Sequence, residues 1–211
     1  MANTIEAQMA AAAGADLIGL VGPMPTGPGV LSLEQCTEIA ATVPDGITTV
    51  LLSSADTADE IARQVRQTGV RAVQLVRHVP QHVHQRLKEL IPNCHRIQVI
   101  HVEGPDAVDL IRIYETDTDA FLLDSGQVNA DRLGGTGCTH DWSISAAFVQ
   151  ATDRPVYLAG GLTPENVLDA LDQVKPFGLD ICSGLRTHDK LDPTKVATFM
   201  ARVKLRQRGP E

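Results

Sequence analysis

Two apolar runs near the C-terminal end of the chain finish in glycines and could bind an anion. The first, Pro155–Gly161, leads through Thr163 and Pro164 into a helical pattern, and the second is Gly178–Gly184. Thr163 suits a helix N-cap and Pro164 the first helical position. A strand that passes through glycines into a helix leaves backbone N–H groups free to meet a phosphate. The expected phosphate-binding residues are Gly160, Gly161, Ser183 and Gly184.

The elements that must position these turns are short, uniformly apolar runs. They are rich in Val, Ile and Leu and barely alternate with polar residues, which is typical of strands covered on both faces. Their starts lie 23 to 35 residues apart, the spacing of β-α units and not of hairpins. The seven runs are Asp16–Gly22, Thr48–Ser53, Ala72–His78, Arg96–Val102, Ala120–Ser125, Pro155–Gly161 and Gly178–Gly184.

Helical patterns fill the gaps between these runs. Ser32 with Gln35, and Thr57 with Glu60, fit capping boxes at helix starts. Asp192 and Pro193 are expected to begin a last helix that continues through Val203. Three glycines stand where helices should end, because glycine adopts the left-handed conformation of many C-termini: Gly14, Gly46 and Gly69.

The order of elements predicts a parallel barrel that lacks one strand. The chain opens with a helical pattern, Thr4–Ala13, and continues with seven strands, whereas a closed (β/α)8 barrel has eight. We therefore expect a single TIM-type (β/α)8 barrel domain over residues 1–211, with its first strand missing. The gap should fall between Asp16–Gly22 and Gly178–Gly184. Bare edges there invite one of three arrangements: Met1 to Glu6 fold into the gap, the sheet closes, or two chains associate.

Composition and charge exclude several classes of function. The net charge is −8 and aromatic residues make up only 3%, which argues against nucleic acid as the main ligand. No apolar run approaches the roughly 20 residues that span a bilayer, and no basic segment opens a secretory signal. The four cysteines are widely spaced, so we expect free thiols and a cytoplasmic location: Cys36, Cys94, Cys138 and Cys182.

Histidines are numerous enough to raise the question of a metal site. Only His78 and His82 have the i, i+4 spacing of helical ligands, and Pro80 interrupts any helix between them. We therefore expect no metal and no other cofactor.

An ordered set of motifs resembles the phosphoribosylanthranilate isomerase family of tryptophan biosynthesis. The match is dense from about Phe121 to Val203 and looser from Ala11 to Val102. It rests on Leu123–Ser125, Gly134–Gly137, Asp141–Trp142, Leu158–Val167, Gly178–Gly184 and Lys190–Asp192. That family is a (β/α)8 barrel that converts an N-linked aldose phosphate into an amino-ketose phosphate by an Amadori rearrangement. This reaction needs a general acid to open the ribose ring and a general base to remove the C2 proton.

The resemblance assigns roles to individual residues. Asp124 falls at the general acid position, although a carboxylate that caps the following loop is the alternative. Asp180 falls near the substrate, and a structural bridge to Arg or Lys is the alternative for a charge inside an apolar strand. Gly135 lies in a loop that resembles the family's mobile loop over the site. Arg186 follows the phosphate turn and is expected either to contact substrate or to be solvated.

The chain departs from the family pattern where the general base should stand. In the family the base is a cysteine on strand one, and the corresponding position falls before Met1. The turn Pro25–Val30 has no basic residue where the family usually has arginine, and Gln74–Arg77 differs from the family's strand-four ending. His101 and Cys138 are candidate replacement bases. The resemblance thus implies an isomerase of a phosphoribosyl amine. Two alternatives stay open: the sequence is that of an N-terminally truncated member, or it is that of a divergent member whose activity is impaired by the missing cysteine. The alternative is a non-catalytic sugar-phosphate binding or regulatory barrel protein. A homodimer is a further expectation.

Overall fold

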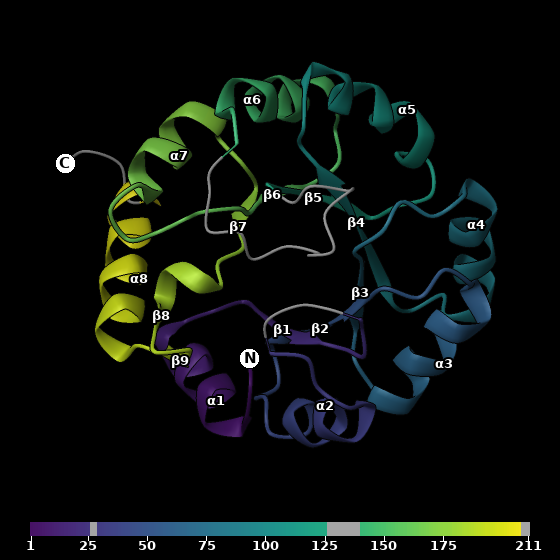
Figure 1. Cartoon of the computed structure of the whole chain (residues 1–211), viewed down its shortest axis with the longest axis horizontal. Helices are drawn as coiled ribbons and strands as arrows, with labels where there is room; N and C mark the ends of the chain where they lie inside the picture. The colour runs from purple at the N-terminus through teal and green to yellow at the C-terminus, as the bar shows by residue number, and fades with distance from the viewer. Residues whose placement is uncertain (26–28, 126–139, 208–211) are drawn as a thin grey trace.

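Seven parallel strands form one curled sheet inside a ring of helices (Figure 1). The computed structural model describes residues 1–25, 29–125 and 140–207, and each strand pairs with the next along the chain. The strands are β1 (Leu17–Val21), β2 (Thr48–Ser53), β3 (Ala72–Leu75), β4 (His95–His101), β5 (Ala120–Asp124), β6 (Val156–Leu158) and β7 (Gly178–Leu179). All seven predicted apolar runs therefore contain a strand, and the parallel α/β fold is confirmed.

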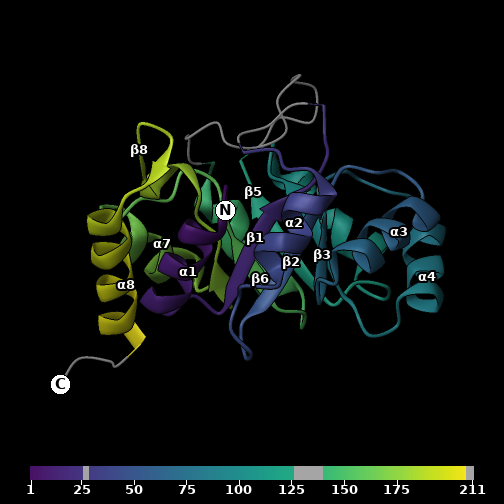
Figure 2. The same ribbon diagram turned by 90° about the horizontal axis from the view of Figure 1, so that it is seen from below.

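Helices cover the outside of this sheet, as the side view in Figure 2 shows. The α-helices are α1 (Thr4–Ala13), α2 (Leu33–Ala40), α3 (Ala58–Thr68), α4 (Gln81–Leu90), α5 (Ile111–Tyr114), α6 (Trp142–Ala151), α7 (Val167–Val174) and α8 (Pro193–Gln207). Two 3₁₀ helices, η1 (Pro105–Leu110) and η2 (Ser183–Leu185), and a small hairpin of β8 (Arg186–Thr187) and β9 (Lys190–Leu191) complete the described elements.

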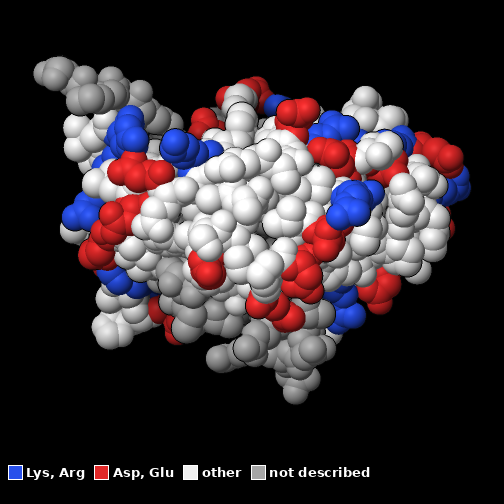
Figure 3. Space-filling model, turned by 90° about the horizontal axis from the view of Figure 1, so that it is seen from above, with Lys and Arg blue, Asp and Glu red and all other residues white. Residues whose placement is uncertain are grey.

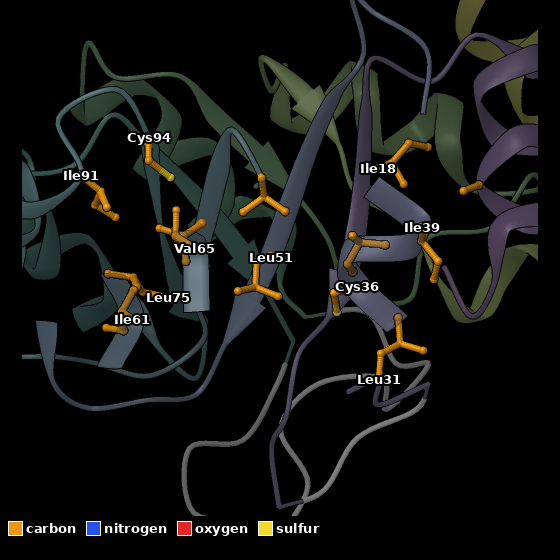
Figure 4. Close-up of a cluster of buried hydrophobic side chains, with 14 of the residues drawn as sticks. Ile18, Leu31, Cys36, Ile39, Leu51, Ile61, Val65, Leu75, Ile91 and Cys94 are labelled. Carbon is orange, nitrogen blue, oxygen red and sulfur yellow. The ribbon is translucent and has the colours of Figure 1, made fainter. Parts of the chain in front are cut away.

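The buried side chains form two layers, because successive strand residues face opposite sides of the sheet. One layer fills the barrel interior and comes mostly from the strands themselves, with Val50, Ile97 and Leu122 among its members. The other layer packs strands against helices, and part of it is drawn in Figure 4. There the strand residues Ile18, Leu51 and Leu75 lie in one buried cluster with helix residues Cys36, Ile39, Ile61 and Val65.

Local capping signals set several helix ends as predicted. At α2, the Ser32 hydroxyl accepts the Gln35 N–H while the Gln35 side chain accepts the Ser32 N–H, which completes the capping box. At α3, the Thr57 hydroxyl accepts the Glu60 N–H, but the Glu60 carboxylate binds Arg63 and Gln64 instead of returning to the cap. Left-handed glycines end α1 and α3, at Gly14 and Gly69.

Two predicted helix boundaries were wrong. The helix α2 ends with Ala41 as its C-cap, and Gly46 lies in the following loop. The helix α7 begins at Val167 with Asn166 as N-cap, and not at Pro164. The Asn166 side chain is the physical reason, because its oxygen accepts the Thr163 N–H at 2.8 Å while its amide donates to the Gly161 carbonyl at 3.0 Å. The Thr163 hydroxyl accepts the N–H groups of Glu165 and Asn166, as the predicted cap should, but residues 164–166 form a turn before the helix begins.

The sheet is open between β1 and β7. Within the described residues β1 pairs only with β2, and β7 only with β6. The edge of β1 that faces away from β2 meets the start of the chain, since the Met1 ammonium donates to the Gly19 carbonyl at 2.6 Å. On the same edge the Val21 carbonyl accepts the Leu31 N–H at 2.9 Å. The first residues thus reach the open edge, as the first of the three expected arrangements requires.

The surface carries charges of both signs. Figure 3 shows Lys and Arg side chains intermingled with Asp and Glu side chains on one side of the molecule. Among the helices of the described segments, none is both long enough and apolar enough to cross a membrane.

Candidate active site

The mouth of the barrel gathers polar side chains at the carboxyl ends of the strands. In β4 the residues Ile97 and Val99 face the barrel interior, so the alternation turns His101 inward at the mouth. In β5 the same alternation carries Asp124 inward, and His101 and Asp124 are register partners on neighbouring strands. Asp180 follows β7 on the other side of β6. Ligands of parallel barrels bind at this end.

Asp124 is half-buried and ends β5. Its carboxylate oxygen Oδ1 accepts the N–H of Ser125 at 2.8 Å, which orients the side chain at the start of the following loop. The loop-capping role that the sequence left as an alternative is therefore present as a hydrogen bond. The same bond leaves Oδ2 free for other partners within the described part of the chain, so a general acid role stays compatible with the geometry.

Asp180 has a carboxyl group at the mouth whose pKa is raised. Its side chain is exposed to solvent, but the surrounding protein atoms remove part of its hydration and raise its pKa to about 6. The negative charge of Asp124 raises that pKa further, while the Met1 ammonium and a hydrogen bond from the Ile181 N–H oppose the shift. No ion pair of Asp180 with Arg or Lys occurs among the described residues. The charge of Asp124 thus makes ionisation of Asp180 less favourable.

The two glycine turns pack directly on their neighbours. Gly160 and Gly161 have φ values of +82° and +63°, and a Cβ on Gly160 would lie 2.0 Å from the Ser125 hydroxyl oxygen. A Cβ on Gly184 would lie 1.9 Å from the Leu162 carbonyl oxygen, which places the turn after β7 against the turn after β6. Because Ser183 and Gly184 begin η2, their N–H groups have no carbonyl of that helix to bind.

Arg186 lies beside this region but is engaged elsewhere. Its guanidinium donates to both carboxylate oxygens of Glu6, at 2.9 and 2.7 Å, and to the Asp189 carbonyl. Burial alone would raise the pKa of Glu6, but hydrogen bonds from Arg186, Ala2 and Leu191 lower it to about 2. A substrate contact by Arg186 stays a prediction, and sequence reasoning missed its partner Glu6.

Two histidines lie close to Asp124. His101 is buried, and its Nε2 lies 2.9 Å from the Val76 carbonyl oxygen, which requires the proton on Nε2; its Nδ1 has no partner among the described residues. His140 lies between two hydroxyl groups, 2.9 Å from Ser125 Oγ and 2.5 Å from Ser145 Oγ. Sequence reasoning missed His140, although it adjoins the Asp141–Trp142 motif.

Other predicted residues lie outside the described segments or lack the predicted partners. Gly135 and Cys138 fall outside the described residues. Cys36, Cys94 and Cys182 are free thiols, as expected for the three cysteines that are described. The described segments hold no group of three or more His, Cys, Asp or Glu side chains that could bind a metal ion.

Comparison with known proteins identifies the family. A family model described as N-(5'phosphoribosyl)anthranilate (PRA) isomerase matches residues 7–202. The chain belongs to the phosphoribosylanthranilate isomerase family. It is 40% identical over 201 residues to N-(5'-phosphoribosyl)anthranilate isomerase 2 of Methanosarcina mazei, and the match covers 94% of this chain and 89% of that protein. The resemblance drawn from the motifs is thereby confirmed.

Solved structures of this family share the fold. Phosphoribosylanthranilate isomerase of Thermotoga maritima superimposes with a TM-score of 0.84 at 26% identity, over 97% of this chain and 95% of that one. A second structure holds phosphoribosylanthranilate isomerase in complex with reduced 1-(o-carboxyphenylamino)-1-deoxyribulose 5-phosphate. It superimposes with a TM-score of 0.81 at 25% identity, again over 97% and 95% of the two chains.

Proposed function

We propose that this chain binds phosphoribosylanthranilate and acts on it as an isomerase. The observation that carries the proposal is the placement of two carboxyl groups, Asp124 and Asp180, at the mouth that also holds the paired glycine turns. A phosphorylated aldose needs an anion site at one end and proton transfer at the other. The family membership supports the same activity.

We assign the phosphate to the turns Gly160–Leu162 and Ser183–Leu185. The contact between Gly184 and the Leu162 carbonyl shows that the two turns pack together, which supports phosphate binding by backbone N–H groups of both. The guanidinium of Arg186 is paired with Glu6. The phosphate in this proposal is therefore bound by backbone N–H donors and not by Arg186.

In the proposed chemistry, Asp124 gives a proton to the ribose ring oxygen as the C1–O bond breaks and a C1=N iminium forms. Removal of the C2 proton then gives an enol-amine, which tautomerises to the amino-ketose. Asp180 is the described mouth residue whose pKa, about 6, suits proton exchange near neutral pH. We propose that it contacts the substrate and takes part of the base's role.

The general base of this reaction should determine the rate. General-base catalysis typically contributes about 10²–10⁴-fold, and we propose that Asp180, a carboxyl group with a pKa of about 6, supplies part of it. We expect Asp180→Asn to reduce kcat at least about tenfold. Native turnover in Asp180→Asn would contradict this expectation, and His101→Ala and Cys138→Ala would then be the variants that search for the base.

The deciding experiment combines binding and turnover. Calorimetry with reduced 1-(o-carboxyphenylamino)-1-deoxyribulose 5-phosphate, a reduced amino-ketose phosphate, should show saturable binding that inorganic phosphate competes for. Asp124→Asn should keep most of this binding and lose the turnover of phosphoribosylanthranilate. If neither ligand binds, the proposed function is wrong.

A non-catalytic sugar-phosphate binding protein is the second candidate. The departure of the chain from the family pattern at Gln74–Arg77 favours it. Binding of the reduced amino-ketose phosphate with no turnover at high enzyme concentration would support this candidate over the isomerase.

A further inference from the structure

His140 joins the first turn of α6 to the end of β5 through a chain of hydrogen bonds. One ring nitrogen, Nδ1, lies 2.9 Å from Ser125 Oγ, and the other, Nε2, lies 2.5 Å from Ser145 Oγ. Ser145 is fully buried within α6, so this end of the chain is fixed by packing. Burial lowers the pKa of His140, and the nearby carboxylates Asp124 and Asp141 oppose that shift. A neutral imidazole can donate to one serine and accept from the other.

Ser125 is the residue through which this chain of bonds reaches the mouth. Its N–H donates to the Asp124 carboxylate at 2.8 Å, so the position of Ser125 sets the direction of that carboxylate. Its hydroxyl lies against Gly160, where a Cβ would come within 2.0 Å of Oγ. One serine therefore touches both the candidate acid and the first phosphate turn.

We propose that His140 is a positioning residue for Asp124. His140 fixes the hydroxyl of Ser125, and the N–H of Ser125 in turn binds the Asp124 carboxylate. The same serine packs against the Gly160 turn. This inference rests on the proposed function, since positioning matters only if Asp124 transfers a proton to substrate. His140 acts through Ser125 and is not assigned a contact with substrate.

A purely structural role for His140 would predict lower stability without a change in the chemistry of the folded protein. The two roles are separated by three variants. His140→Phe keeps the ring but removes both hydrogen bonds, whereas His140→Gln keeps a donor and an acceptor. Ser143→Ala is the matched control, because Ser143 also makes a side-chain hydrogen bond in the first turn of α6, but to Asp141 and not towards the mouth.

The measurements are single-turnover rates at saturating enzyme, affinity for the reduced amino-ketose phosphate, and the NMR shift of the Ser125 amide proton. Loss of one well-placed hydrogen bond changes an equilibrium or rate by up to about tenfold. We expect His140→Phe to lower the rate about tenfold, with ligand affinity changed less than threefold and the Ser125 amide resonance moved. His140→Gln should recover most of the rate, and Ser143→Ala should match the native protein in all three readouts.

Each outcome decides between the alternatives. A native rate and an unmoved Ser125 resonance in folded His140→Phe would overturn the proposal. An equal loss in Ser143→Ala would overturn it too, because the effect would then come from a weakened α6. If His140→Phe fails to fold, Ser125→Ala removes the same hydrogen bond from the other side and must show the same loss of rate.

If the native protein binds the ligand but shows no turnover, the Ser125 resonance is the measurement that tests the positioning role. If the native protein binds no ligand, the proposed function itself is wrong.

Discussion

At the scale of single residues, the site is built from positions that tolerate little change. Gly184 presses on a backbone carbonyl of the neighbouring turn, and Gly160 presses on Ser125. Loss of hydration and the neighbouring charge of Asp124 raise the pKa of Asp180. Close backbone contact and like charges both cost stability, and such costs are typical of functional sites.

Substitution of Gly184 should weaken phosphate binding through shape alone. Gly184→Ala places a Cβ 1.9 Å from the Leu162 carbonyl oxygen, so one of the two turns must move. We expect affinity for inorganic phosphate, measured by calorimetry, to fall at least tenfold, because the N–H donors of the two turns can no longer bind the same phosphate together. Gly46→Ala is the control: Gly46 has φ +96° but nothing within 4 Å of an added Cβ. Unchanged phosphate affinity in Gly184→Ala would contradict the assignment of the phosphate to these two turns.

Asp180→Asn should stabilise the fold at neutral pH. The folded-state pKa of Asp180 is raised to about 6 from an ordinary value of 3.8, so ionisation in the folded protein is unfavourable. The cost is absent below about pH 4, grows between pH 4 and 6, and is complete above pH 6. Thermal unfolding should therefore show a higher Tm for Asp180→Asn at pH 7.5 and an equal Tm at pH 4. Asp153→Asn, on an exposed loop, is the control, and equal gains in both variants would refute the argument.

At the scale of elements, a buried ion pair ties the first helix to the last β/α unit. Glu6 of α1 pairs with Arg186 of β8 at 2.7 Å, and the side chains are 8% and 17% exposed. The same carboxylate accepts the Leu191 N–H of β9, so α1 is bound to both strands of the hairpin. The structure thus holds α1 in place although the sheet is open beside it.

Removal of the Glu6 charge should destabilise the protein strongly. Glu6→Gln leaves the Arg186 guanidinium buried and without its counter-ion, which typically costs about 3 kcal/mol. The pKa of Glu6 is lowered to about 2, so the stabilisation is present above about pH 4.5 and is lost as the pH falls towards 2. Urea unfolding at pH 7 and pH 4 measures both effects. Glu89→Gln, in the exposed pair with Arg86, should change little, and a similar loss in both variants would contradict the prediction.

At the scale of the whole molecule, the barrel is a curled sheet with one open seam. Parallel strands bond through alternate residues, and Gly19 and Val21 direct their backbone groups away from β2. The Gly19 and Val21 carbonyls have partners at this edge, but no hydrogen bond from the N–H of either residue is found in the described segments. An unpaired edge of this kind can accept another strand.

Amide hydrogen exchange should distinguish the β1 residues that face the open edge from those that face β2. We expect the amides of Gly19 and Val21 to exchange at least about tenfold faster than those of Ile18 and Leu20, which face β2. Light scattering on the same samples gives the oligomeric state. Equal, slow exchange of all four amides in a proven monomer would contradict an open seam, whereas slow exchange that is confined to a dimer would place the dimer contact at β1.

The sequence by itself determined the features that depend on neighbours along the chain. Apolar runs gave the seven strands, the Ser32–Gln35 box and Gly14 gave helix ends, and the motifs around Gly160 and Gly184 identified the family. These features follow from backbone conformation and hydrogen bonds within a few residues, so a pattern in the sequence is enough to predict them.

Only the tertiary structure decided which distant residues meet. Glu6 and Arg186 are 180 residues apart, and nothing in either local sequence indicates their pairing. The link from His140 to Ser125 and the coupling of Asp124 with Asp180 likewise depend on how the sheet curls. Even the start of α7 was set by the side-chain bonds of Asn166 rather than by helix propensity. Curling of the sheet brings the strand ends into one mouth, and the charges and hydrogen bonds of the site exist only once that has happened.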